Sequence, residues 1–341
     1  MKIIIPMAGR GSRLRPHTLT TPKPLLPVAG KAIVRRIVED LASGLDEQVE
    51  DVAFIIGDFG PEAEEQLQQI AHGIGAHCSI YYQDQPLGPG HAVLCAKPSL
   101  EGHCLVAFAD TLFNANFHFN AQEDGIIWVS KVDNPSSFGV VKINDANIIT
   151  DFVEKPATFV SDQAIVGIYY FREGEKLRDT LQHIVDSDIR DKGEYQLTTA
   201  LELLKTNGLK FRPAQIEEWL DCGNKDNILA TNKRMLELKS ASEQLIEEGI
   251  MIDNAVIVAP CFIGQGAVIR NSVVGPYVSL GNNSLVEHTV ISSSIIQNNT
   301  KVLRANLHQS MLGNEVDYQG EKSEISIGDY SQYKLSILKT P

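Results

Sequence analysis

The sequence predicts two domains of different fold class: an α/β domain with a three-layer, mostly parallel sheet, followed by a parallel β-helix. Up to about residue 130, short apolar segments typical of strands alternate with segments typical of helices. From about residue 251, apolar residues recur every 16 or 17 positions instead. The length of 341 residues also exceeds what one compact domain usually needs.

The first domain begins with a strand, Ile3 to Ile5, that leads directly into a glycine-rich turn. The alternation that follows indicates βαβ units and hence Rossmann-like layers. In this part we expect strands at 51–56, 79–82 and 104–109, and helices at 62–71 and 91–96. The next part is strand-rich and then helical, with strands expected at 126–132, 139–143, 148–153 and 164–171, and helices at about 174–187, 195–206 and 224–248.

The C-terminal repeat has three apolar positions in each period of 16 or 17 residues, and small or polar residues follow them. The three series are Ile252, Ile269, Val286, Val302 and Tyr318; Ile257, Val274, Ile291 and Leu307; and Ile263, Leu280, Ile296 and Leu312. One inward aliphatic residue on each of three faces describes a hexapeptide-repeat parallel β-helix. The predicted boundaries are a first domain at 1–235, a connecting helix at 236–250, the β-helix at 251–330 and a tail at 331–341.

Composition narrows the function classes. A formal net charge of −13 disfavours a nucleic-acid partner, which would require a basic surface. No apolar run approaches the roughly 18 residues of a membrane span, so we expect no membrane partner. The five cysteines include no C-x-x-C pair, which favours reduced thiols and a cytoplasmic location.

The glycine-rich turn predicts a phosphate-binding loop. Gly9 and Gly11 allow backbone N–H groups to approach an anion closely, and Arg13 and Lys23 can add positive charge. The turn is neither of the two commoner phosphate motifs. Gly30-Lys31 is followed by Ala32, which excludes a Walker loop, and Leu14 stands where the dinucleotide fingerprint requires its third glycine.

The loop and its continuation resemble the signature of the sugar nucleotidyltransferases (nucleotide-sugar pyrophosphorylases), A-G-G-x-G-T-R-L-x-P-x-T followed by P-K-x-L-L-P-V. The residues in register with it are Ala8, Gly9, Gly11, Ser12, Arg13, Leu14, Pro16, Thr18, Pro22, Lys23, Leu25, Leu26, Pro27 and Gly30. The resemblance implies that Ala8, Gly9, Gly11, Ser12 and Arg13 bind the nucleotide. It also implies that the β-helix is left-handed, as in many members of this family.

Two aspartates predict a magnesium site. Asp110 ends the apolar run 105–109 and therefore lies at the carboxyl end of a central strand, where α/β sheets bind ligands. The family's metal-binding aspartate stands in the same context, and Asp221 in Trp219-Leu-Asp-Cys-Gly223 resembles the W-x-D-x-G that brings a second ligand. Carboxylates are ligands that Mg²⁺ prefers.

Further segments resemble the base-binding and sugar-binding parts of the family. Gln83 and Gly88 lie in the segment that meets the pyrimidine, and a glutamine amide can pair with a uracil or thymine edge. For the sugar 1-phosphate the resemblance implies Gly139, Glu154, Lys155 and Val166, with Lys155 on the phosphate. Residues 194–198 resemble an E-x-x-L-T segment, which we interpret mainly as helix initiation with a sugar contact.

The resemblance implies Mg²⁺-dependent transfer of a nucleotidyl group from dTTP or UTP to a sugar 1-phosphate, with glucose 1-phosphate as the expected sugar. The implied catalytic residues are Arg13, Lys23, Asp110, Lys155 and Asp221. Two alternatives are a bifunctional enzyme whose β-helix also transfers an acetyl group from acetyl-CoA, through His288 or His308, and a non-catalytic regulatory or scaffold relative. We also expect a homo-oligomer, because flat coil faces favour self-pairing.

Overall fold

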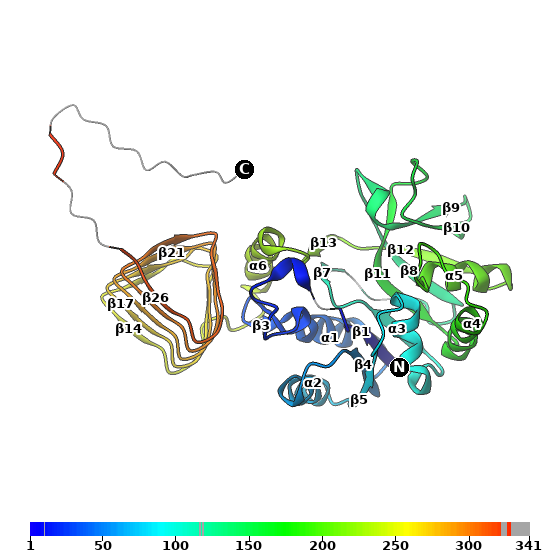
Figure 1. Ribbon diagram of the computed structural model, residues 1–341, viewed down its shortest axis with the longest axis horizontal. Helices are drawn as coiled ribbons and strands as arrows, with labels where there is room; N and C mark the ends of the chain where they lie inside the picture. Colours follow the sequence, from blue (N-terminus) through cyan, green and yellow to red (C-terminus); the bar gives the residue numbers. More distant parts are fainter. Residues whose placement is uncertain (10, 116, 118, 322–325, 329–341) are drawn as a thin grey trace.

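The computed structural model describes residues 1–9, 11–115, 117, 119–321 and 326–328. The expected tail at 331–341 lies outside these residues. Figure 1 shows an α/β domain beside a β-helix that is seen nearly end-on as a triangle, with α6 and β3 between the two. No helix in the described part of the chain has the length and apolar character that crossing a membrane requires.

The centre of the main sheet is parallel. Its strands lie in the order β6 (Cys104–Ala107), β1 (Lys2–Pro6), β4 (Asp51–Ile56) and β5 (His77–Tyr82). All six residues of β4 are buried, as expected for a parallel strand covered on both faces. Alternate residues of β1 enter two separate cores, Ile3 and Ile5 on one face and Ile4 on the other.

Helices cover both faces of this sheet. One core includes residues of α1 (Ile33–Gly44), α2 (Pro61–Gly73) and α6 (Lys225–Lys239). The other core includes residues of α3 (Pro89–Cys95), α4 (Gly174–Asp186) and α5 (Leu197–Thr206). The predicted three-layer arrangement is therefore confirmed.

Beyond β6 the sheet continues with antiparallel strands. β11 (Gln163–Phe171) pairs with β6 and with β8 (Gly125–Lys131), and β9 (Gly139–Ile143) and β10 (Ile149–Glu154) form a hairpin at the edge. β12 (Phe211–Gln215) runs parallel to β8. Within the described residues this sheet has nine strands, and a separate ribbon joins β7 (Thr111–Asn114) to β13 (Glu218–Asp221).

The segment between the domains differs from the prediction. Helix α6 ends at Lys239, so the expected helix to 248 and the connecting helix at 236–250 are wrong. Residues 240–250 instead fold back onto the first coil, where the Ile263 N–H donates to the Leu245 carbonyl (2.9 Å) and the Glu247 N–H donates to the Ile263 carbonyl (3.0 Å). These tertiary contacts outweigh the helix propensity of the Glu-rich segment.

The C-terminal strands form the three faces of a left-handed β-helix, and the register of the three apolar series is as predicted. The first face comprises β14 (Met251–Asp253), β17 (Val268–Arg270), β20 (Leu285–Glu287), β23 (Lys301–Leu303) and β26 (Asp317–Gln319). The second comprises β15 (Val256–Ile257), β18 (Val273–Val274), β21 (Val290–Ser292) and β24 (Asn306–His308). The third comprises β16 (Phe262–Ile263), β19 (Ser279–Leu280), β22 (Ile295–Ile296) and β25 (Met311–Leu312).

The inner positions of the middle coils are fully buried, but the two ends of the first face are open. Ile269 and Val286 are 0% exposed, whereas Ile252 is 50% and Tyr318 is 40% exposed. Residues at one corner, Asn254, Asn271, His288 and Arg304, repeat a left-handed backbone conformation. Self-association through the coil faces stays a prediction.

A short hairpin of the first domain, β2 (Pro27–Val28) and β3 (Lys31–Ala32), lies at the boundary with the β-helix. Asn232 of α6 is 0% exposed and binds both sides of this junction. Its Oδ1 accepts hydrogen bonds from the Ala29 N–H (2.8 Å) and the Ser279 hydroxyl (2.7 Å), and its Nδ2 donates to the Tyr277 carbonyl (3.4 Å).

Candidate active site

Two adjoining cavities open at the carboxyl ends of β1 and β6. The smaller, of about 370 Å³, is lined by the glycine-rich loop and the segment after β5. The larger, of about 660 Å³, lies among β9, β10, β11 and β13. Both cavities are lined by the same six residues, Arg13, Lys23, Pro89, Phe108, Asp110 and Glu194. The predicted phosphate-binding cations and one predicted metal ligand therefore lie where the two cavities meet.

The glycine-rich loop lies against the lysine segment. At Gly11 the backbone is left-handed (φ 62°), and a Cβ would lie 2.7 Å from the Lys23 Cβ, so the position requires glycine. The Thr18 hydroxyl donates to the Gly11 carbonyl (2.8 Å) and fixes the turn. Of the predicted loop residues, Ala8, Gly9, Gly11 and Arg13 line the smaller cavity, whereas Ser12 lines neither cavity.

Gln83 lines the smaller cavity with its amide orientation fixed. Its Nε2 donates to the Gly88 carbonyl and to His91 Nδ1, both at 3.1 Å. Its Oε1 accepts no hydrogen bond from any described residue and so remains available as an acceptor. Burial lowers the pKa of His91, which favours the neutral ring that can accept this bond. The sequence alone did not indicate this role for His91.

The two predicted metal ligands line the larger cavity together. The ribbon of β7 and β13 places Asp221 opposite Thr111, the residue after Asp110. The Lys23 Nζ donates to the Asp110 backbone carbonyl (3.0 Å) and not to its carboxylate. The Asp110 carboxylate has no hydrogen-bond donor among the described residues. The Asp221 carboxylate accepts hydrogen bonds from the Gly223 N–H (2.7 Å) and from the Asn227 side chain.

This donor set fits Mg²⁺. Two carboxylates supply hard oxygen ligands, and substrate phosphates and water usually complete a magnesium site. In the described ranges no group of three or more His, Cys, Asp or Glu side chains is arranged to hold a metal by itself. A Mg²⁺ ion held by Asp110 and Asp221 would therefore need further ligands from substrate phosphates or water.

Three of the predicted sugar-binding residues lie on or directly after the β9–β10 hairpin, and the fourth, Val166, lies in β11. Gly139 pairs with Glu154, and a Cβ at Gly139 would lie 3.1 Å from the Glu154 Oε2. That oxygen also accepts a hydrogen bond from the Thr198 hydroxyl (3.1 Å). The Lys155 Nζ lies 3.7 Å from the Glu154 Oε1, and Lys155 has a left-handed backbone (φ 42°). All four predicted residues, Gly139, Glu154, Lys155 and Val166, line the larger cavity.

Two further residues hold this hairpin in place, and the sequence did not indicate this role for either of them. Lys192 donates to the backbone carbonyls of Glu154 (2.9 Å) and Lys155 (2.8 Å) and thereby fixes their backbone. Thr198, in the second position of α5, fixes the Glu154 carboxylate. Sequence spacing does not reveal such contacts, because each joins segments 37 to 44 residues apart.

Comparison with known proteins decides the family. Residues 2–237 match the family model described as nucleotidyl transferase, which is more than half of the chain. The chain belongs to the nucleotidyl transferase family. It is 30% identical over 262 residues to the bifunctional protein GlmU of Methanococcus maripaludis, an alignment that covers 76% of this chain and 60% of GlmU. It is 29% identical over 293 residues to a glucose-1-phosphate thymidylyltransferase of Streptomyces griseus, covering 77% of this chain and 78% of the relative.

Solved structures resemble this nucleotidyl transferase in fold. An apo UDP-glucose pyrophosphorylase aligns with a TM-score of 0.57 at 23% identity, covering 70% of this chain and 98% of the other. The two β-helix histidines that were considered for acetyl transfer occupy positions within the coils. His308 Nδ1 lies 2.9 Å from the Ser292 Oγ on the next coil, and His288 occupies a left-handed corner (φ 51°).

Proposed function

We propose that the protein transfers a nucleotidyl group from dTTP or UTP to a sugar 1-phosphate, with glucose 1-phosphate as the expected sugar, and releases pyrophosphate. The observation that carries this proposal is the meeting of two cavities at Arg13, Lys23 and Asp110. One cavity has the glycine-rich loop of a triphosphate site, and the other has the carboxylate and lysine of a sugar-phosphate site. The names of the relatives support the same class of reaction.

In this proposal the nucleotide occupies the smaller cavity and the sugar phosphate the larger. The uracil or thymine N3–H donates to the Gln83 Oε1, whose partner amide nitrogen is already engaged. A phosphate oxygen of the sugar 1-phosphate attacks the α-phosphorus. The new P–O bond forms as the bond to the leaving pyrophosphate breaks. The nucleophile is already anionic, so catalysis consists mainly of positioning and charge stabilisation.

The remaining residues have distinct roles. Arg13 and Lys23 stabilise negative charge at the junction of the cavities. Glu154 accepts hydrogen bonds from sugar hydroxyls, and Lys155 binds the sugar phosphate. Asp110 and Asp221 would hold a Mg²⁺ ion, which when bound neutralises part of the triphosphate charge. No second function is proposed, because His308 pairs with Ser292 and His288 occupies a corner of the coil.

The test is pyrophosphate release with Mg²⁺, combining dTTP, UTP, CTP, ATP and GTP with the 1-phosphates of glucose, glucosamine, N-acetylglucosamine and mannose. We expect activity with dTTP or UTP and glucose 1-phosphate, and none after addition of EDTA. A folded protein that releases pyrophosphate with none of the pairs would contradict the proposal.

Asp110→Asn should lower kcat by roughly a thousandfold or more, because the amide loses the negative charge that holds the metal. The thermal unfolding temperature should stay unchanged, since the carboxylate has no hydrogen-bond donor among the described residues. Asp145→Asn, in an exposed turn, is the matched control and should retain full activity. Near-normal turnover of the Asp110 variant would remove Asp110 from the metal site.

A further inference from the structure

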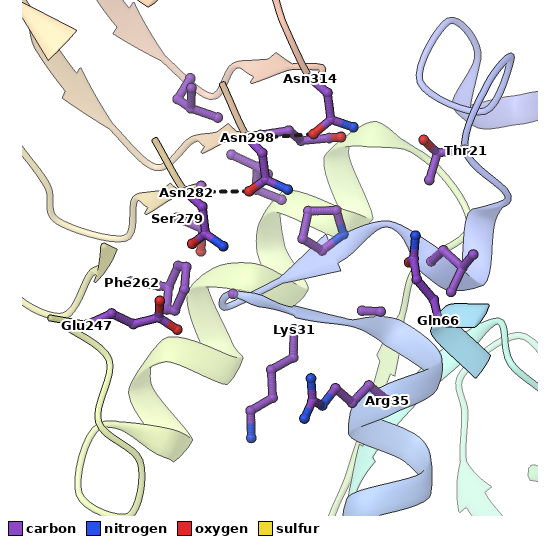
Figure 2. A pocket seen from close by; sticks show the side chains of 18 of the residues that line it. Thr21, Lys31, Arg35, Gln66, Glu247, Phe262, Ser279, Asn282, Asn298 and Asn314 are labelled. Carbon is purple, nitrogen blue, oxygen red and sulfur yellow. Dashed lines mark hydrogen bonds between the residues drawn. The ribbon is translucent and has the colours of Figure 1, made fainter. Parts of the chain in front are cut away.

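A third cavity, of about 590 Å³, lies between the two domains. It shares no lining residue with the two catalytic cavities. Figure 2 shows Thr21, Lys31, Arg35 and Gln66 on the side of the first domain, and Asn282, Asn298 and Asn314 in a row on the β-helix. The cavity is therefore a separate, polar space with walls from both domains.

The three asparagines form a row of hydrogen-bond donors on successive coils. The Asn298 Oδ1 accepts from the Asn282 N–H (2.8 Å), and the Asn314 Oδ1 accepts from the Asn298 N–H (3.0 Å), as the dashed lines in Figure 2 mark. Each of these bonds fixes a side chain and leaves its NH₂ group without a partner among the described residues. Coils of a β-helix are about 4.8 Å apart, so the amides present donors at a regular spacing.

Gln297 gives independent evidence for a ligand. It lines the cavity and is only 4% exposed, yet its side-chain amide forms no hydrogen bond with any described residue. The amide atoms of Gln297 therefore meet only the space of the cavity. A ligand with both hydrogen-bond donors and acceptors can pair with this amide.

Each charged side chain that lines the cavity already has a partner, and Glu247 accepts a hydrogen bond from the Gln265 N–H (2.9 Å). The Lys31 Nζ lies 2.7 Å from the Glu39 Oε2 and 3.6 Å from the Glu243 Oε1, and the Arg35 Nε lies 2.8 Å from the Glu39 Oε1. Apolar side chains also line the space, among them Phe262 and Ile70. Carboxamides, paired charges and an aromatic ring suit a neutral ligand that is rich in hydroxyl groups, with C–H faces that pack on apolar groups.

We propose that this cavity binds a hexopyranose, either a free sugar or the sugar part of a nucleotide sugar, and that its occupancy changes turnover. Thr21 and Leu25 line the cavity and flank Lys23, which lines both catalytic cavities. A sugar bound at Thr21 and Leu25 therefore acts on the segment that carries Lys23. Binding is independent of the proposed function, whereas the effect on turnover rests on it.

Calorimetric titration of the full-length protein tests binding with D-glucose, N-acetyl-D-glucosamine, maltose and UDP-glucose. We expect at least one of them to bind, and Gln297→Leu and Asn282→Ala to weaken that binding about tenfold each, the effect of one hydrogen bond. Asn306→Ala, an exposed amide on another face, is the control and should bind like the wild type. Glu154→Gln, which impairs the catalytic sugar pocket, should leave the third-cavity binding intact.

The outcomes separate the two sugar sources and the two sites. Binding of glucose, N-acetylglucosamine or maltose identifies a free sugar, and binding of UDP-glucose alone identifies a nucleotide sugar. Absence of binding by all four probes, or binding lost only in Glu154→Gln, overturns the proposal. Asn282→Ala keeps the result interpretable if Gln297→Leu alters folding, because Asn282 is exposed. For an active enzyme, the sugar should change kcat in the wild type, and Gln297→Leu should need about tenfold more sugar for the same change.

Discussion

In the proposed function, the hydrogen bond between Gln83 and His91 links recognition of the nucleotide base to a titratable group. The Gln83 amide can donate to His91 Nδ1 only while the ring is neutral, and burial lowers the His91 pKa below the ordinary value of about 6.5. Protonation would replace the acceptor with a donor. The amide would then lose one of the two contacts that orient it toward the base.

The affinity for the pyrimidine nucleotide should therefore be independent of pH above 6.5 and fall in more acidic solution, as His91 becomes protonated. His91→Asn offers a non-titrating acceptor and should remove this component. The measurement is KM for the nucleotide between pH 8 and 5 in both proteins, since titration of the substrate phosphates affects both equally. An equal rise in KM at low pH in the wild type and the variant would refute the role of His91.

Lys155 is expected to act on one substrate only. Its side chain is half exposed, lines the larger cavity and has a carboxylate at 3.7 Å as its neighbour. Lys155→Ala should raise KM for the sugar 1-phosphate by roughly 10- to 100-fold, the effect of losing a charge-assisted hydrogen bond, with KM for the nucleotide unchanged. Lys131→Ala, which removes an exposed lysine paired with Asp162, serves as control. Equal increases in both KM values would argue against a specific phosphate contact.

At the scale of the elements, the β2–β3 hairpin packs closely against the β-helix at Gly30. Gly30 has φ 86°, and a Cβ there would lie 2.3 Å from the Phe262 ring. Gly30→Ala should reduce the free energy of unfolding by about 1–3 kcal/mol more than Gly75→Ala does. Gly75 is a matched control, because it has a similar backbone conformation (φ 76°) and no atom near the added methyl. Urea unfolding of both variants measures the difference. Equal losses in the free energy of unfolding would show that the Phe262 ring does not exclude a methyl group at position 30.

Elements with a regular spacing of apolar residues could be predicted from the sequence. Elements whose boundaries depend on tertiary contacts could not. The β-helix register followed from the 16- and 17-residue spacing, because each coil repeats one local structure. The end of α6 did not, because residues 240–250 pack on Ile263, a contact that no local pattern encodes. In the candidate site, motif residues such as Arg13 and Asp110 line the predicted cavities, whereas Lys192 and Thr198 became apparent only from the folded chain.

At the scale of the whole molecule, Asn232 joins α6, the hairpin and the β-helix through three hydrogen bonds, two of them buried. Asn232→Ala would leave the buried Ala29 N–H and the buried Ser279 hydroxyl without this partner. We expect a loss of about 3 kcal/mol in the free energy of unfolding, against less than about 0.5 kcal/mol for the exposed Asn306→Ala. Denaturant unfolding of the full chain measures both. A loss at Asn232 no larger than the control would mean that the domains do not depend on this side chain.

The open ends of the β-helix have a consequence for how such a chain can change length. Ile252 and Tyr318 are about half exposed because no further coil of the described residues covers them, and each described coil pairs only with its neighbours. Duplicating the 16 residues from Leu303 to Tyr318 would add a complete turn in register and cover the original Tyr318 with the added coil. The junction at Ser279 and the catalytic cavities would keep all their contacts. Growth by whole turns at this end is therefore an insertion that the catalytic domain can tolerate without any compensating substitution.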